Sequence, residues 1–148
     1  MLDALVILDL TLMAMVFGYG MSASAVSYPA MMASSRETAV GYFKPFFHKS
    51  NHLQLGLSIA VLLVSLAVSY LSRNWWWFTG AVILQVSGPY TIIVLMPVNR
   101  RIMAEGADIH SDQMSDDLGR WGRLHLPRTL IAGAIFILFA YLAVVGGV

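Results

Sequence analysis

Four long runs of apolar residues, separated by short polar stretches, form the main pattern of the sequence. The runs cover about residues 4–30, 46–71, 75–97 and 126–148. Each has at least the roughly 20 residues with which a helix crosses a hydrocarbon core of about 30 Å. The pattern predicts an all-α fold, an integral membrane four-helix bundle that forms a single transmembrane domain over residues 1–148.

The composition agrees with a membrane protein and excludes several other classes. The chain is 58% hydrophobic and 11% charged, whereas a soluble domain has roughly 45–50% apolar and 25% charged residues. The net charge of +1 comes from well-separated charges, so we expect the lipid bilayer and not nucleic acid as a partner. Cysteine is absent, so disulfides and thiol catalysis are excluded, and a metal ion would need histidine or oxygen ligands.

The start of the first run decides whether it is a cleaved signal peptide. Ala23-Ser24-Ala25 resembles a cleavage site, but Asp3 stands where a basic residue is expected and Asp9 interrupts the apolar region. We therefore interpret the run as a retained span. An unpaired carboxylate inside a membrane is costly, so we expect Asp9 to pair with Arg73 or with the N-terminal amine, with proton transfer as the alternative.

The polar connections predict the topology. Large loops are expected over residues 31–44 and about 99–114, and Ser115, followed by two aspartates, is expected to cap the last helix. Most basic residues gather on this side of the bundle, while the other side holds only Arg73. These basic residues are Arg36, Lys44, Lys49, Arg100, Arg101, Arg120, Arg123 and Arg128. By the positive-inside rule the large loops are cytoplasmic and both termini lie outside, and we expect a bacterial inner membrane.

A kink is expected in the third run. Pro89 removes the hydrogen bond to the carbonyl of Gln85, next to Gly88 and near the bilayer midplane. The buried amide of Gln85 is interpreted as a contact between helices, with a role in a site as the alternative.

A short internal repeat relates the two halves of the chain. Tyr28-Pro29 aligns with Met96-Pro97, and His52-Leu53 aligns with His125-Leu126. If the halves are pseudo-symmetric, His52 and His125 face each other.

Histidines supply the first candidate chemistry. His48 and His52 lie four residues apart, which places two imidazoles on one helix face. His125 would add a third nitrogen ligand for a metal ion or a haem. The alternative is that these histidines only bond headgroups and loop carbonyls.

The start of the last run carries a second polar group. Trp121, His125 and Arg128 share one helix face at i, i+4 and i+7. Arg128 is costly in a membrane unless it is paired or its head snorkels to phosphate groups. No carboxylate is close in sequence, so we expect Arg128 to snorkel. Trp121 belongs either to an interfacial belt or to a pocket, and Asn99 either caps the third helix or reaches across to the fourth.

Three motifs resemble the anthrone-oxygenase-like family, small four-helix membrane proteins long classed under a domain of unknown function. The motifs are Ser24-Ala-Val-Ser-Tyr-Pro29, Pro97-Val-Asn99 and Trp121-Gly-Arg-Leu-His125-Leu-Pro-Arg128. The similarity spans nearly the whole chain.

The resemblance implies oxidation of an anthrone to an anthraquinone by O₂ with no organic cofactor required. His52 or His125 would be the base that removes the acidic ring CH proton. Arg128 would stabilise the enolate oxygen, and Asn99 would donate a hydrogen bond. The aromatic walls of the site would be Tyr28 and Trp121. For this chain we expect an oxygenase-like oxidoreductase that acts on an apolar aromatic or quinone-like small molecule at the cytoplasmic membrane interface.

Two other functions are compatible with the sequence. One is a metal or haem protein ligated by His48, His52 and His125, and the other is a non-catalytic membrane subunit. Either form, like the oxygenase, could be a homo-oligomer. A transporter is disfavoured because four helices with one or two intramembrane ionisable groups offer no evident ion path.

Overall fold

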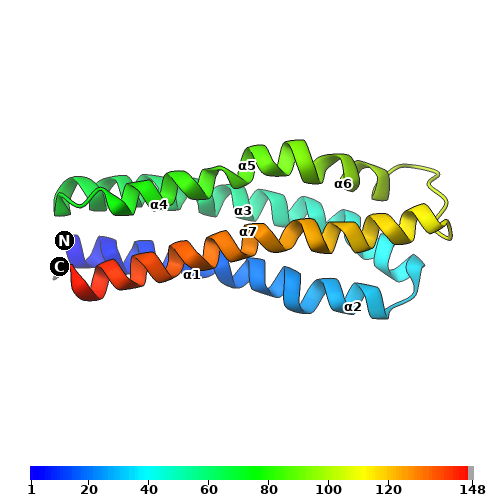
Figure 1. Cartoon of the computed structure of the whole chain (residues 1–148), viewed down its shortest axis with the longest axis horizontal. Helices are drawn as coiled ribbons and strands as arrows, with labels where there is room; N and C mark the ends of the chain where they lie inside the picture. Colours follow the sequence, from blue (N-terminus) through cyan, green and yellow to red (C-terminus); the bar gives the residue numbers. More distant parts are fainter. Residues whose placement is uncertain (147–148) are drawn as a thin grey trace.

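A computed structural model describes residues 1–146, which form four long helical spans (Figure 1). The first span consists of α1 (Leu2–Ser22), the π-helix η1 (Ala23–Ser27) and α2 (Tyr28–Ala33), and the second is α3 (Arg36–Ser72). The third consists of α4 (Trp76–Gln85), α5 (Ser87–Tyr90), the π-helix η2 (Thr91–Leu95) and α6 (Met96–Ile102), and the fourth is α7 (Asp112–Val145). All four are long and apolar enough to cross a membrane, which confirms the predicted all-α four-helix fold. Residues 147–148, the end of the predicted last span, lie outside the described residues.

The spans form an up-down-up-down bundle. α1 packs against α3 and α7, and α4 packs against the same two helices, so the four spans close into a ring. Both chain ends lie at one end of the bundle, and the connection between α6 and α7 lies at the other (Figure 1). Many large apolar side chains face outward, as expected for helices that contact lipid.

The backbone widens into a π turn just before a proline in two spans. Tyr28 N–H bonds a carbonyl five residues earlier, and Met96 N–H does the same. Pro29 and Pro97 follow directly. A proline lacks the N–H and its ring crowds the carbonyl four residues back, so a local π turn relieves the clash. The Tyr28-Pro29 and Met96-Pro97 part of the predicted repeat thus corresponds to two matching π turns in the structure.

The third span is interrupted at Val86, where α5 is displaced sideways from α4 (Figure 1). Pro89 cannot donate to the carbonyl of Gln85, so the expected kink is present and begins two residues before Gly88. α4 packs closely along α3, whereas α5 and η2 do not. The bend therefore separates the second and third spans in the middle of the bundle.

The first predicted loop is mostly helical. The Ser35 hydroxyl accepts a hydrogen bond from the Thr38 N–H and caps α3, which begins at Arg36. The expectation of a loop over residues 31–44 is therefore wrong, because polar turns that extend a helix beyond its apolar run lack the apolar pattern by which spans are recognised.

The second connection is also shorter than predicted. The loop expected over about 99–114 covers only 103–111. Ser111, and not Ser115, caps α7 by accepting a hydrogen bond from the Met114 N–H. Arg101 closes the connection with two hydrogen bonds of 2.8 and 2.6 Å to the Asp117 carboxylate. α7 then continues through Pro127 as one helix.

Two apolar clusters with a polar layer between them fill the bundle. The cluster nearer the chain ends includes Val61, Trp77, Leu84, Ile135 and Phe139. The cluster nearer the α6–α7 connection includes Phe43, Leu95, Val98, Leu118 and Trp121. The layer between them holds hydroxyl, amide, imidazole and guanidinium groups. These polar groups make the layer the candidate for a binding or catalytic site.

Asp9 is buried in the first cluster without an ion pair. Ser65 Oγ donates to Asp9 Oδ2 over 2.7 Å. Arg73 instead lies over the Tyr70 ring, 5.2 Å from its centroid. Neither of the two ion pairs among the described residues involves Asp9. The expected pairing with Arg73 or the N-terminal amine is therefore wrong, because a hydroxyl from α3 serves the carboxyl group within the bundle.

Candidate functional site

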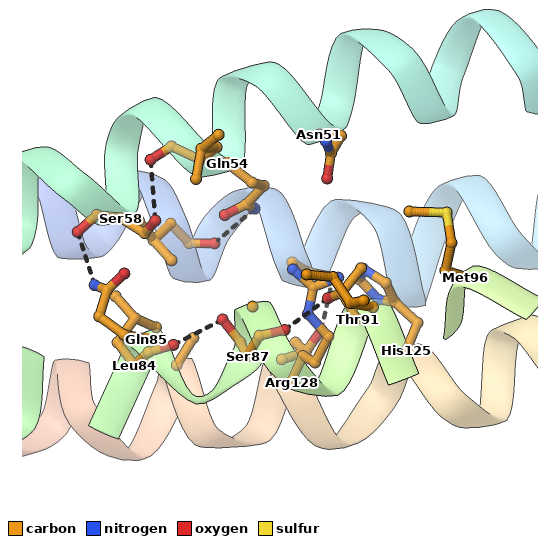
Figure 2. Close-up of a pocket in the computed structure, with 17 residues that line it drawn as sticks. Asn51, Gln54, Ser58, Leu84, Gln85, Ser87, Thr91, Met96, His125 and Arg128 are labelled. Atoms are coloured by element: carbon orange, nitrogen blue, oxygen red, sulfur yellow. Dashed lines mark hydrogen bonds between the residues drawn. The ribbon is translucent and has the colours of Figure 1, made fainter. Parts of the chain in front are cut away.

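A cavity of about 240 Å³, here called the main cavity, lies in the polar layer between α3, the bend of the third span and α7 (Figure 2). A side cavity of about 40 Å³ adjoins it. The side chains that line both are Asn51, Gln54, Thr91, His125 and Arg128. Because one set of groups serves both cavities, we treat them as a single site. In Figure 2 the Asn51 amide points from α3 into this space.

His125 is held in position from two sides. Ser24 Oγ, from η1, lies 3.0 Å from His125 Nδ1. Trp121, one turn earlier on α7, stacks on the imidazole with the ring centroids 5.1 Å apart and the planes 28° apart. The ring therefore lines the cavity in a defined orientation, with Nδ1 toward η1.

Arg128 places its guanidinium in the same cavity, beside His125 (Figure 2). Its Nε is buried with no hydrogen-bond partner, and it takes part in neither ion pair of the described residues. The expectation that Arg128 snorkels to headgroups is wrong, because it lies three residues after His125 on the same inner face of α7. A cation with no carboxylate partner among residues 1–146 thus lines the cavity.

Asn99 and Trp121 line the side cavity. Asn99 lies within α6 and is 1% exposed, and its Oδ1 has no hydrogen-bond partner among residues 1–146. It reaches toward α7 instead of capping the third span. Trp121 is 3% exposed, so it belongs to the pocket and not to an interfacial belt.

Three other predicted site residues lie outside the cavities. His48 and His52 are exposed on the outer surface of α3, so His52 does not face His125 as the repeat predicts. Tyr28 packs over Gly122 and near Trp121, with its hydroxyl 3.4 Å from the Gly119 carbonyl. Its role in this position is to pack α2 against α7.

The predicted three-histidine metal site is not assembled. In the part of the chain that the structure describes, no three His, Cys, Asp or Glu side chains are grouped closely enough to hold a metal ion. Of the three proposed ligands, only His125 points into the bundle.

Several site residues were not singled out from the sequence. Thr129 follows His125 by four residues, a spacing that would have placed it on the same face. Gln54 lies on the Asn51 side of α3, three residues further on. Ser24 opens the first family motif, but its direction toward α7 was not predicted, because it depends on the π turn that precedes Pro29. The Ser24 hydroxyl contacts His125, and the Thr129 hydroxyl contacts that of Ser24. Gln54 lines both cavities.

The cavity opens through the side of the bundle. Leu55 of α3 and Ile92 of η2 line it while remaining 55% and 66% exposed. They lie on either side of the separation between α3 and the bent third span. In a membrane this opening would face acyl chains, so an apolar compound dissolved in the bilayer can reach the polar groups.

The site combines an imidazole, a guanidinium without a carboxylate and a lateral opening, which together suit the deprotonation of an apolar molecule that becomes anionic. The sequence profile described as anthrone oxygenase matches residues 43–138, more than half of the chain. No curated protein and no solved structure is significantly similar to the chain. The matched region includes α3 from Phe43 onward, the bent third span and the Trp121–Arg128 stretch of α7. The chain is therefore an integral membrane protein that belongs to the anthrone oxygenase family.

Proposed function

We propose that the protein is a membrane oxygenase that oxidises an anthrone-like compound, a fused-ring aromatic ketone with an acidic CH₂ group. The observation that carries this proposal is the pair formed by His125 and Arg128 in one laterally open cavity. A buried cation costs free energy unless an anion or hydrogen-bond acceptor approaches it. The enolate oxygen of a deprotonated anthrone is such an acceptor.

His125 acts as the base in this proposal. It removes one proton from the CH₂ carbon, and the negative charge moves to the ketone oxygen as the ring system gains aromatic character. Arg128 stabilises that oxygen, which lowers the barrier because the interaction strengthens as the charge develops. Asn99, in the side cavity, is placed to hold the substrate or the oxygen molecule.

The oxygen step follows from the electron-rich carbanion. The anion transfers an electron to O₂, and recombination forms the carbon–oxygen bond of a peroxide, which takes the proton back from His125. Loss of water from the hydroperoxide breaks the O–O bond and leaves the new ketone. One CH₂ group and one O₂ are thus converted to one C=O group and one H₂O, and the carbon is oxidised while both oxygen atoms are reduced.

The size and polarity of the cavity fit such a substrate. A cavity of about 150 Å³ in another protein holds benzene, so about 240 Å³ has room for a larger fused-ring molecule. Gln85 Nε2 donates to the carbonyls of Ser58 and Ala81 over 3.0 and 3.3 Å. Both of its amide hydrogens are therefore used, and its Oε1 is left to accept a hydrogen bond from a substrate hydroxyl.

The orientation in the membrane is part of the proposal. The basic residues near the α6–α7 connection support an orientation in which that end of the bundle lies in the cytoplasm of a bacterial cell and both termini lie outside. The cavity would then receive its substrate from the bilayer and lie closer to the cytoplasmic side. A reporter protein that is active only in the cytoplasm should be inactive when it is fused to Val148. Activity of this fusion would overturn the proposed orientation.

The test is oxygen uptake by the purified protein in nanodiscs with anthrone as substrate. We expect anthraquinone as product, with one ¹⁸O atom from ¹⁸O₂ in the new carbonyl, at a rate above the spontaneous oxidation. Arg128→Gln should lower kcat by about 10²–10³-fold, and His125→Ala should lower it by about 10²–10⁴-fold.

Matched variants separate the site from its surroundings. Arg123→Gln changes an exposed arginine of the same helix and should leave kcat unchanged. His52→Ala should also retain activity, because His52 lies outside the cavity. Full activity in Arg128→Gln, or no activity above the spontaneous rate in the unmodified protein, would refute the proposed function. Stoichiometric metal or haem in the active protein would refute the cofactor-free reaction.

A further inference from the structure

We propose that Ser24 and Thr129 are positioning residues that hold His125 in the tautomer with the proton on Nδ1, so that Nε2 is the basic nitrogen. This inference deepens the proposed function, in which His125 is the base. It rests on a chain of three contacts that joins α1, η1 and α7. The contacts are Gly20 O to Thr129 Oγ1 at 3.1 Å, Thr129 Oγ1 to Ser24 Oγ at 3.0 Å, and Ser24 Oγ to His125 Nδ1 at 3.0 Å.

The direction of the chain is fixed at its first member. A backbone carbonyl can only accept, so Thr129 donates its single hydroxyl proton to Gly20. Thr129 Oγ1 then has only lone pairs for Ser24, and Ser24 must donate its own single proton to Thr129. Ser24 Oγ therefore meets His125 with a lone pair. The contact of 3.0 Å is a hydrogen bond only when His125 Nδ1 carries a proton.

The surrounding structure makes this chain rigid. Thr129 is 1% exposed, and a Cβ built on Gly20 would lie 3.1 Å from Thr129 Oγ1, so the two helices meet closely at this point. Ser24 lies inside the π turn of η1, five residues before Pro29. π turns widen the helix and shift the direction of the side chains within them. The proline-driven turn and the absence of a side chain at Gly20 thus allow the hydroxyls of Thr129 and Ser24 to form a chain that ends at His125.

The tautomer matters for the reaction. A neutral imidazole has one nitrogen with a proton and one with a free lone pair, and only the latter can remove a proton from the substrate. With Nδ1 protonated toward Ser24, the lone pair is on Nε2, the nitrogen left for a molecule in the cavity. A histidine without this partner is expected to populate the Nε2–H form, in which no basic nitrogen is directed at the substrate.

Nitrogen NMR of substrate-free protein in bilayers tests the tautomer directly. A variant with His48, His52 and His110 replaced by Gln keeps His125 as the single histidine, and all three replaced residues are exposed. With ¹⁵N-histidine labelling we expect a protonated Nδ1 and an unprotonated Nε2. Thr129→Val removes the acceptor of Ser24, so the Ser24 proton can turn to Nδ1 and the signal should change to the Nε2–H form.

Two further variants separate positioning from general damage. Ser24→Ala should shift the tautomer and lower kcat by about 10–100-fold, as loss of a supporting hydrogen bond does at other sites, while KM changes little. Ser24→Thr restores the hydroxyl and should restore both readouts. Ser22→Ala changes an exposed serine of the neighbouring turn and should change neither.

The possible outcomes separate this inference from the proposed function. An Nε2–H tautomer in the otherwise unmodified protein, or an unchanged tautomer in both Ser24→Ala and Thr129→Val, would overturn the inference whatever the activity. The predicted tautomer pattern in a protein that does not oxidise anthrone would leave the positioning intact and refute the proposed reaction alone.

Discussion

The amide of Gln85 gives a prediction about substrate choice. Its two N–H groups are donated to the backbone, so its oxygen can only accept. Replacing it in Gln85→Met removes the acceptor at nearly constant volume. For an anthrone with a ring hydroxyl, kcat/KM should fall by about 3–10-fold, the effect of one neutral hydrogen bond. Unsubstituted anthrone should be oxidised as before.

Competition between the two substrates measures this preference in one reaction. Gln113→Met, an exposed glutamine outside the cavity, is the matched control. An equal loss for both substrates would mean that Gln85 supports the fold between α3 and α4 and does not recognise a hydroxyl.

At single positions the sequence predicts spacing better than direction. The face shared by Trp121, His125 and Arg128 is present as predicted, because all three lie on one uninterrupted helix. On α3 the repeat predicted that His52 faces His125, but His52 is exposed and lies outside both cavities. Successive residues are about 100° apart around a helix. The inner face of α3 contains Asn51, Ser58 and Ser65, which follow one another at a spacing of seven residues. His52 therefore points to the outside.

Close packing of α2 on α7 gives a prediction at the level of elements. A Cβ on Gly122 would overlap the Tyr28 ring. Gly122→Ala should therefore push α2 away from α7 and cost about 1–3 kcal/mol, the usual range for an overpacked contact. The measurement is the apparent melting temperature in detergent, which should fall by several degrees.

Gly119 provides the control for this contact, three residues earlier on the same helix. A Cβ there would meet only the end of the Arg123 side chain at 3.8 Å. Alanine also favours helix formation over glycine by about 1 kcal/mol. Gly119→Ala should leave the melting temperature unchanged or raise it. Equal effects of the two substitutions would show that Tyr28 does not hold α2 in place.

The prolines show how far elements can be predicted. The sequence aligned Tyr28-Pro29 with Met96-Pro97 as part of a repeat, and in the structure a π turn precedes each of these prolines. The π turns themselves were not predictable. A proline inside a helix can produce a kink, a restart or a widened turn. At Pro127 the helix α7 shows neither a restart nor a π turn. The packing of neighbouring helices decides between these outcomes.

For the whole molecule, the ring of four spans follows from the apolar runs, whereas the cavity does not. Its main wall exists because α5 and η2 leave α3 at the bend, while α4 stays in contact with it. That separation is a property of helices packed together in space. The sequence showed the polar residues of the layer one by one, but only the fold unites His125, Arg128 and the amides of α3 in one space.

The lateral opening gives the last prediction, which concerns the route to the site. Ile92 lines the opening and is 66% exposed, whereas its neighbour Ile93 is 72% exposed and lies outside the cavity lining. Ile92→Trp should narrow the opening and lower kcat/KM for anthrone by about tenfold, equivalent to about 1.4 kcal/mol. Ile93→Trp adds the same bulk to the lipid-facing surface and should leave kcat/KM unchanged.

A charged anthrone shows independently whether the substrate arrives through the bilayer. A sulfonated anthrone dissolves in water and stays out of the acyl chains, whereas anthrone itself enters them. If the substrate passes between Leu55 and Ile92 from the acyl chains, the sulfonated compound should be oxidised much more slowly than anthrone. Rapid oxidation of the sulfonated compound, together with full activity of Ile92→Trp, would mean that the substrate reaches His125 from the water-facing end of the bundle.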